Sequence, residues 1–257
     1  MVENEKQQTS GVVRTIAILE ALAHLPRTNL EQLSRQTSLP KATLLRFLNT
    51  LIGLGYVNRD SADQYNLTLK MFSVGSHSLE HLDLMDTASP VAQRLCDTFG
   101  ETVHMGILDD YHAVYVMKKE SSYTIRMYSR VGKSIPLYCT GIGKILLGGM
   151  NSKELESYLE SVKLKPYTPK TIRTIDALRA EIQQVRRQGW ACDDEEHETG
   201  TFCIAAPIRD YTPGHIVAAM SVSWPLFRFD MHERERYTKI IMDECLNLSK
   251  QLGYESN

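Results

Sequence analysis

Two segments near the N-terminus, residues 28–36 and 41–53, place apolar side chains at the spacing of a helix. In the second segment, steps of about 100° per residue gather an apolar set on one side: Leu44, Phe47, Leu48 and Leu51. The same steps gather a small and polar set on the opposite side: Ala42, Arg46, Asn49 and Gly53. The pattern predicts a helix with one buried face and one slim, basic face.

The residues before these segments predict where each helix begins. Thr28 and Glu31 have the spacing of a capping box, in which each side chain satisfies a free backbone N–H. A short turn over residues 37–39 leads to Pro40, which suits the first position of a new helix. Two helices joined by so short a turn predict a helix–turn–helix motif.

The pattern on both sides of this motif completes a winged helix–turn–helix. A preceding helix, over about residues 12–25, is expected to pack inward through Val12, Ile16, Leu19 and Ala23. Gly55 is expected to close the second helix of the motif in a left-handed conformation. Residues 56–59 and 64–68 then have the pattern of two short strands joined by a polar turn, which is a wing.

The slim face predicts duplex DNA as a partner. Bulky side chains would hold a helix out of the major groove, whereas Arg and Asn can read base edges. The candidate DNA-contact residues are Thr28, Lys41, Ala42, Thr43, Leu45, Arg46, Asn49 and Arg59. For the two helices alone, an ordinary pair of surface helices is the alternative, and the wing favours DNA.

Charge is unevenly distributed along the chain. The 257 residues carry a formal net charge of −2, yet residues 27–59 contain five basic residues and one acidic residue. A local basic patch of this kind is the electrostatic pattern expected for phosphate contact. The remainder of the chain is acidic, which indicates a different task.

Beyond residue 70 the pattern predicts a helical connection and then a mixed domain. From residue 101, strands and helices follow one another without the βαβ rhythm of a parallel sheet, which predicts an α+β fold with an antiparallel sheet. The predicted organisation is a winged helix–turn–helix domain over residues 10–72, a linker helix over 73–88 and a second domain over 89–252.

Composition narrows the class of protein. No apolar run is long enough to span a membrane, and the polar N-terminus does not resemble a secretion signal. Five scattered cysteines favour reduced thiols and a cytoplasmic location. Cys192, His197 and Cys203 match no common zinc spacing, and no nucleophile motif is present. We therefore expect no metal, no cofactor and no catalytic residue.

Two segments of the second domain are candidates for holding a ligand. Gly141-Ile142-Gly143-Lys144 precedes an apolar helix but lacks the residues of a P-loop or a dinucleotide fingerprint. Free amides and the dipole at a helix start favour an anion such as a carboxylate, and a tightly packed turn is the alternative. The acidic run over residues 193–198 is either a solvated loop or a wall that binds a polyhydroxy ligand.

Together these motifs resemble the IclR family of bacterial transcription regulators over nearly the whole length. In the first domain the resemblance lies in Leu39-Pro40-Lys41-Ala42-Thr43, Arg46-Phe47-Leu48 and Gly55-Tyr56-Val57. In the second domain it lies in Thr140-Gly141-Ile142-Gly143-Lys144, Asp193-Asp194-Glu195-Glu196-His197, Cys203-Ile204-Ala205-Ala206-Pro207 and Ser221-Val222-Ser223. Within the family, residues 66–70 and 126–132 look most like repressors of 2-keto-3-deoxygluconate catabolism.

The resemblance implies a GAF-like, effector-binding second domain, and dimers that pair into tetramers on palindromic operators in double-stranded DNA. It implies an effector pocket formed by Met127, Ile135, Gly141, Ile142, Asp193, Cys203, Ser221 and Ser223. In that pocket the amides of Gly141 and Ile142 would take a carboxylate, and Asp193 with the serines would take hydroxyl groups. Ser221 and Ser223 are two apart on a predicted strand and so point to one face.

We therefore expect a repressor of sugar-acid or related carboxylate catabolic genes, controlled by a small hydroxy- or keto-carboxylate. The alternative is an enzyme that acts on a sugar acid and carries an appended DNA-binding domain. Turnover of sugar acids by the purified protein would distinguish the enzyme from the regulator.

Overall fold

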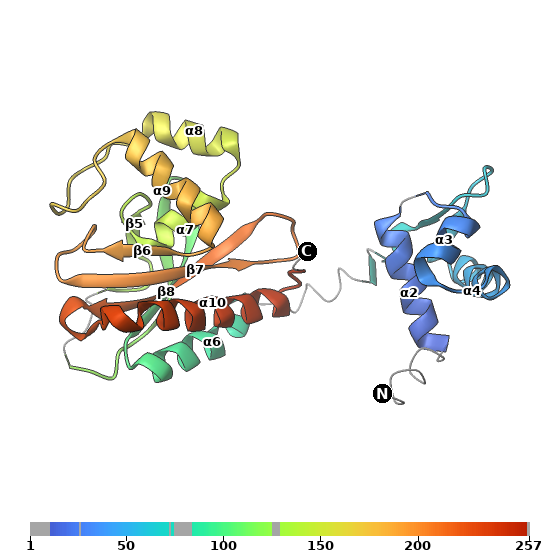
Figure 1. Ribbon diagram of the computed structural model, residues 1–257, viewed down its shortest axis with the longest axis horizontal. Helices are drawn as coiled ribbons and strands as arrows, with labels where there is room; N and C mark the ends of the chain where they lie inside the picture. Colours follow the sequence, from blue (N-terminus) through green and yellow to red (C-terminus); the bar gives the residue numbers. More distant parts are fainter. Residues whose placement is uncertain (1–10, 26, 72, 75–83, 125–128, 256–257) are drawn as a thin grey trace. The chain divides into compact units, whose positions relative to one another are not determined.

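The computed structural model describes residues 11–25, 27–71, 73–74, 84–124 and 129–255. The chain divides into two compact units, Met1–His81 and Leu82–Asn257 (Figure 1). The predicted linker helix over residues 73–88 includes residues 75–83, which lie outside the described part, and its limits stay a prediction. No helix in the described ranges combines the length and the apolar character needed to cross a membrane.

The N-terminal unit packs helices against a two-stranded hairpin. Its elements are α2 (Gly11–His24), α3 (Leu30–Thr37), α4 (Lys41–Gly53), β1 (Val57–Arg59) and β2 (Tyr65–Leu67), with β1 and β2 antiparallel. In α4 the buried residues are Leu44, Leu48 and Leu51, and the exposed ones include Ala42, Arg46, Asn49 and Gly53. The predicted wing and the predicted two faces of the second helix are confirmed.

The inward face of α2 differs from the sequence prediction. Ile18, Ala21 and Leu22 are buried, whereas Val12 is 71% exposed and Ile16 is 48% exposed. Ala23 is exposed as well, so the predicted inward face is wrong at Val12, Ile16 and Ala23, while Leu19 is half-buried and packs against the core. Because α2 has apolar residues on several sides, its own periodicity does not select one face, and contact with α3 and β2 makes the choice.

The N-terminus of α3 also differs from the prediction, by one residue. Asn29 is the N-cap: its side chain accepts the Gln32 amide at 2.9 Å, and the Gln32 side chain accepts the Asn29 amide at 3.2 Å. Thr28 instead forms a β-bridge to Tyr65, and Glu31 pairs with Arg35 at the surface. The predicted capping box of Thr28 and Glu31 is wrong. The sequence spacing fits the pair Thr28 and Glu31 and the pair Asn29 and Gln32 equally well, and the β-bridge of Thr28 to Tyr65 leaves Asn29 as the residue that begins the helix.

Both ends of α4 depend on residues with special backbones. Pro40, predicted at the first helical position, is the N-cap, and the helix begins at Lys41. At the other end Gly55 adopts a φ of 80°, and its amide bonds the Ile52 carbonyl at 2.9 Å. The Tyr56 amide bonds the Leu51 carbonyl, also at 2.9 Å, so the helix ends in a Schellman motif. The left-handed closure predicted at Gly55 is confirmed.

The C-terminal unit is built on one antiparallel sheet, in agreement with the α+β prediction. Its helices are α6 (Leu84–Phe99), α7 (Gly141–Gly149), α8 (Ser152–Ser161), α9 (Ile175–Gln188) and α10 (Arg234–Gln251), with short turns η1 (Leu226–Arg228) and η2 (Met231–Glu233). Its strands are β3 (Thr102–Asp109), β4 (His112–Lys119), β5 (Ser134–Pro136), β6 (Ala191–Asp194), β7 (Thr201–Arg209) and β8 (Ile216–Pro225). The strand order is β5-β4-β3-β8-β7-β6, and every neighbouring pair is antiparallel.

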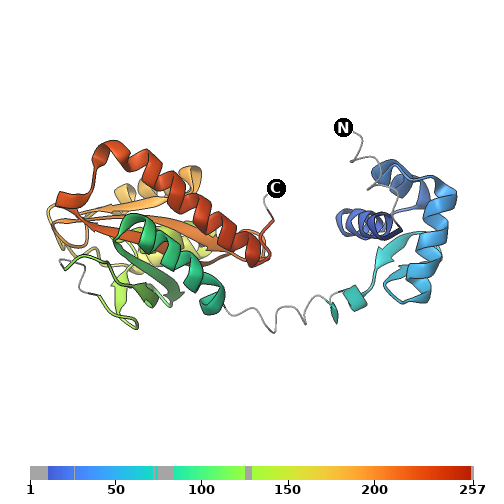
Figure 2. The ribbon, with the colours of Figure 1, turned by 90° about the horizontal axis from the view of Figure 1, so that it is seen from below.

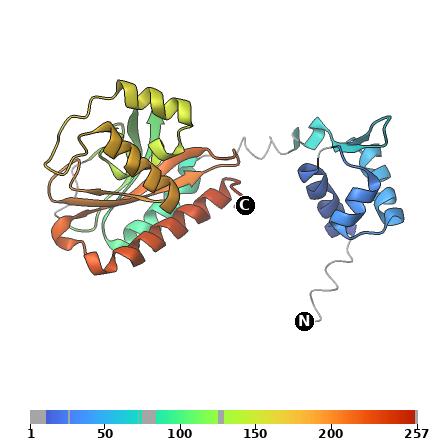
Figure 3. The same ribbon diagram turned by 45° about the horizontal axis from the view of Figure 1, so that its top comes forward.

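Helices cover both faces of this sheet. Figure 2 shows α6 and α10 side by side on one face, and Figure 3 shows α8 and α9 on the opposite side of the sheet from α10. Since side chains alternate along a strand, Val103 and Met105 join the core beneath α6 and α10, while Ala205 and Ala219 join the core beneath α7. His104, between two residues of the first core, therefore lies on the α7 face.

We predict that Asn29→Ala lowers the stability of the N-terminal unit by about 1 kcal/mol, because the substitution leaves a helix-start amide without its cap. The matched control is Glu31→Gln, which changes only exposed ion pairs, those with Arg35 and Lys41, and should shift stability by less than about 0.5 kcal/mol. Urea unfolding of both variants measures the difference. A larger loss for Glu31→Gln than for Asn29→Ala would contradict the observed cap.

Candidate DNA-binding surface and ligand pocket

Most of the candidate DNA-contact residues lie on one exposed strip of α4. The exposed ones are Lys41, Ala42, Leu45, Arg46 and Asn49, with Thr43 half-buried beside them. The guanidinium of Arg46 lies 5.4 Å from the centroid of the Phe47 ring, a cation–π contact on a residue that stays exposed. Such an arginine can reach a base edge or a phosphate.

Two further candidates lie outside α4. Arg59 is exposed on β1 of the wing, where it pairs with Asp63 at 2.9 Å. Thr28 is only 2% exposed: its hydroxyl donates to the Gln32 side chain at 3.0 Å, and its backbone is bonded to Tyr65. The side chain of Thr28 thus serves the fold, and the proposed DNA surface excludes it.

A small cavity at the start of α7 contains most of the residues predicted for the effector pocket. The predicted residues that line it are Ile135, Gly141, Ile142, Asp193, Cys203, Ser221 and Ser223. Met127, the remaining one, lies outside the described residues. We call this space the α7 cavity. Its cavity volume of about 30 Å³ is room for about two water molecules.

Strand register explains why residues far apart in sequence meet in this cavity. Cys203 of β7 lies opposite both Asp193 of β6 and Ser223 of β8, and Ser221 lies opposite His104 of β3. Paired residues in an antiparallel sheet share a face. Four strands therefore present polar side chains toward the N-terminus of α7.

The first turn of α7 supplies hydrogen-bond donors to the cavity. Thr140 is the N-cap: its hydroxyl accepts the Gly143 amide at 3.1 Å and donates to the Pro136 carbonyl at 2.7 Å. The amides of Gly141 and Ile142 have no partner within the helix, because the first amide that bonds a carbonyl of the helix is that of Lys144, which donates to Thr140. Together with the helix dipole, they favour a negatively charged group at this point.

The glycines of this turn also have a packing role. A Cβ on Gly143 would lie 2.4 Å from the backbone of Leu137, and a Cβ on Gly141 would lie 3.1 Å from the Cβ of Ala205. The packing interpretation and the anion-binding interpretation of this motif are therefore compatible. Close packing brings the helix start to the sheet, where its amides reach the cavity.

Asp193 is the most deeply buried acid of the cavity, at 4% exposure. Burial raises the pKa of this carboxyl to about 7, although hydrogen bonds from the amides of Glu196 and His197 oppose the rise. Those amides donate to Oδ1 at 2.7 and 3.3 Å. A carboxyl with such a pKa is present in both protonation states near neutral pH, so it can donate as well as accept a hydrogen bond.

The acidic run holding Asp193 is fixed from behind by Lys144. This lysine is 1% exposed, and its Nζ lies 2.5 Å from Glu196 Oε1 and 3.0 Å from Glu181 Oε1. Burial acts to lower the pKa of Lys144, but the two carboxylates outweigh it and hold the pKa above its usual value. The lysine of the Gly-Ile-Gly-Lys motif is thus a buried clamp, which means that its ion pairs tie Glu196 of the acidic run to Glu181 of α9. The acidic run over residues 193–198 is therefore only partly exposed to solvent.

Sequence reasoning missed several residues of the cavity. They are Tyr115, Thr140 and Thr201; His197 and Glu198 also line the cavity and belong to the acidic run that the sequence offered as a candidate wall. Thr140 carried a usable signal, because a threonine directly before a glycine-led helix fits an N-cap. Tyr115 carried none, since only the pairing of β3 with β4 brings it to this face.

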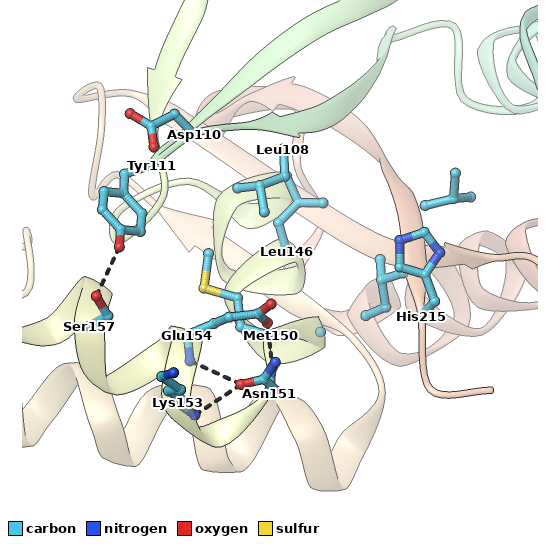
Figure 4. Close-up of a pocket in the computed structure, with 13 residues that line it drawn as sticks. Leu108, Asp110, Tyr111, Leu146, Met150, Asn151, Lys153, Glu154, Ser157 and His215 are labelled. Carbon is cyan, nitrogen blue, oxygen red and sulfur yellow. Dashed lines mark hydrogen bonds between the residues drawn. The ribbon is translucent and has the colours of Figure 1, made fainter. Parts of the chain in front are cut away.

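A larger groove of about 700 Å³ lies at the opposite end of α7 and contains none of the predicted residues (Figure 4). Several of its polar groups bond one another. The Asn151 side chain accepts the amides of Lys153 and Glu154, and the hydroxyls of Tyr111 and Ser157 are 3.0 Å apart. The α7 cavity differs in that helix-start amides and a buried carboxyl converge on it.

We predict that Asp193→Asn changes how stability depends on pH. The carboxyl holds its proton more tightly in the folded state, with a pKa of about 7, than at the ordinary value of 3.8. Its contribution is therefore fully present below about pH 4 and is lost as the pH rises through 7. Between about pH 4 and pH 8, urea unfolding should show wild type losing roughly 4 kcal/mol relative to the variant. A difference that does not vary with pH would contradict the raised pKa.

Comparison with known proteins agrees with both units. The profile of the IclR helix-turn-helix domain matches residues 11–61, and that of the bacterial transcriptional regulator IclR C-terminal region matches residues 76–250. The HTH-type transcriptional regulator KdgR of Escherichia coli (strain K12) is 37% identical over 254 residues, covering 98% of this chain and 96% of that protein. KdgR of Dickeya chrysanthemi is 35% identical over 254 residues, with coverage of 98% and 83%.

A solved structure is similar over both units. The crystal structure of Thermotoga maritima IclR has a TM-score of 0.64 and 30% sequence identity, and it covers 95% of this chain and 98% of that one. Both matching profiles describe parts of transcriptional regulators, so the alternative of an enzyme gains no support from them. This chain belongs to the IclR family of bacterial transcriptional regulators.

Proposed function

We propose that this regulator represses genes for the catabolism of sugar acids or related carboxylates, and that a small hydroxy- or keto-carboxylate in the α7 cavity controls it. One observation carries the proposal: amides of a helix start, a buried carboxyl and two serines converge on a single cavity. These are the groups needed to bind a carboxylate at one end of a ligand and oxygen atoms at the other. The likeness to two HTH-type transcriptional regulators named KdgR supports the regulatory role in this proposal.

The size of the α7 cavity supports a link between ligand binding and conformation. A sugar acid is much larger than the two water molecules that a cavity of about 30 Å³ accommodates. The ligand therefore binds only a wider form of the cavity. A ligand shifts an equilibrium by its difference in affinity for the two forms, so an effector that needs the wide form populates it.

On the DNA side, the exposed strip of α4 is proposed to enter the major groove. A winged helix–turn–helix domain over residues 10–72 would hold this strip, with residues 73–88 linking it to the effector domain. Dimers that pair into tetramers would place recognition helices on the half-sites of a palindromic operator, whose spacing such helices must match. The effector would act by changing that spacing.

We predict that Arg46→Ala weakens binding to the palindromic operator by about 1–3 kcal/mol, the range expected for one lost bidentate base contact. Fluorescence anisotropy with operator and random duplexes, at several salt concentrations, measures the loss. Arg187→Ala is the control, because Arg187 is an exposed arginine on α9. Unchanged operator affinity of Arg46→Ala at every salt concentration would remove Arg46 from the interface.

We also predict that Ser221→Ala weakens effector binding at least several-fold, because a ligand oxygen loses its partner. A thermal-shift screen of 2-keto-3-deoxygluconate, gluconate and pyruvate selects the ligand, and calorimetry measures its affinity. Ser157→Ala, in the groove of Figure 4, is the matched control and should bind normally. Weaker binding by Ser157→Ala with normal binding by Ser221→Ala would place the ligand in the groove instead.

A further inference from the structure

His104 lies directly behind the α7 cavity and was not among the predicted site residues. It occupies β3 opposite Ser221, is 1% exposed, and stacks on the ring of Tyr115 with a centroid separation of 4.5 Å. Burial lowers the pKa of His104 to about 3, with the nearby Lys118 adding to the effect. The imidazole is therefore neutral near pH 7, with one ring nitrogen that donates and one that accepts.

Both ring nitrogens face serine hydroxyls. Nε2 lies 2.6 Å from Ser129 Oγ, and Nδ1 lies 3.4 Å from Ser223 Oγ. Ser223 Oγ also accepts from the Cys203 thiol at 3.2 Å. Lys118 Nζ donates to the Ser129 carbonyl at 2.9 Å, which holds Ser129 beside the ring. The tautomer of His104 thus decides the direction of a chain of hydrogen bonds that ends at the cavity.

The two distances favour one tautomer. A separation of 2.6 Å lies just below the usual range for an N–H donor and within the range for a hydroxyl donor, which favours Ser129 as the donor to Nε2. The ring proton then resides on Nδ1 and points to Ser223 Oγ. That oxygen accepts from His104 and from Cys203, which uses both of its lone pairs, and its own hydrogen is left for the cavity.

We propose that His104 is a specificity-determining residue of the α7 cavity, which makes Ser223 a hydrogen-bond donor and so selects an effector with a carbonyl oxygen there. A keto oxygen only accepts and fits this donor. A ligand hydroxyl can also accept from Ser223, but its own hydrogen then needs a second acceptor, which Ser223 does not provide because both of its lone pairs are used. The inference rests on the proposed function and narrows its ligand class from hydroxy- or keto-carboxylates to keto-carboxylates.

The tautomer of His104 can be measured without any ligand. In the full-length protein with ¹⁵N-labelled histidine, long-range ¹H–¹⁵N spectra distinguish the two neutral tautomers, and loss of signals in His104→Gln assigns His104 among the eight histidines. The expected result is the Nδ1–H form, unchanged from pH 8 to pH 5. The Nε2–H form, or a charged ring at pH 6, would overturn the proposal whether or not the effector class is right.

Ligand selectivity provides the second test, with a matched pair of variants. The amide nitrogen of asparagine can take the place of Nδ1, and that of glutamine the place of Nε2. Calorimetry compares 2-keto-3-deoxygluconate with the 2-hydroxy acid obtained by its reduction. We expect wild type and His104→Asn to prefer the keto acid about tenfold, the factor for one unsatisfied hydrogen bond of about 1.4 kcal/mol, and His104→Gln to lose that preference.

The outcomes separate this inference from the proposed function. An unchanged keto preference in a folded His104→Gln protein, with wild-type thermal stability, would overturn the role of His104. Failure of wild type to bind either acid would count against the proposed effector class, and the spectra would then decide the role of His104. A preference lost in both variants would show that the ring packs against Tyr115 without directing Ser223, and would also overturn the proposal.

Discussion

The close approach of α7 to the sheet is the constraint on which the α7 cavity depends. Gly143 lies against the backbone of Leu137, and Gly106 of β3 leaves room for Ile142, whose Cγ2 would be 2.9 Å from a Cβ there. These contacts bring the helix start to the polar ends of four strands. A helix held farther away would leave its amides in water, where an anion gains little from them.

The same helix also carries the residue that fixes the far wall of the pocket. Lys144 is one turn beyond the first amides, and its buried charge needs the carboxylates of Glu181 and Glu196. Buried ion pairs add little net stability, but removing one partner leaves an isolated charge, so their geometry is strongly enforced. The Thr168 and Thr171 hydroxyls, which donate to the Glu195 and Glu196 carbonyls at 2.6 Å, hold the same turn. Asp193 therefore meets the cavity from a rigid support.

The two units place their charged and polar groups differently: the N-terminal unit exposes them, and the C-terminal unit buries several of them. The N-terminal unit keeps basic side chains such as Arg46 exposed on a slim helix face, where they can meet phosphates and base edges. The C-terminal unit buries polar groups such as Asp193 and His104, whose pKa values shift because water is excluded. The exposed strip of α4 therefore suits a large, highly charged partner, and the α7 cavity suits a small ligand.

The sequence by itself determined features that depend on neighbours along the chain. The two faces of α4, the left-handed Gly55 and the wing follow from local periodicity and backbone preference, and all appear as predicted. Local patterns were ambiguous where adjacent residues could serve equally, as at Thr28 and Asn29, or where apolar residues surround a helix, as in α2. There, contact with another element made the choice.

The tertiary structure alone decided which distant residues share the cavity and in what protonation state. The family resemblance supplied the predicted pocket residues, but Tyr115 and His104 carried no signal in the sequence, and nothing in it indicated that Lys144 pairs with Glu181 and Glu196. Strand register and helix packing place them, and both are set by contacts between residues far apart in the chain. Burial, which raises the pKa of Asp193 and lowers the pKa of His104, exists only once those contacts have formed.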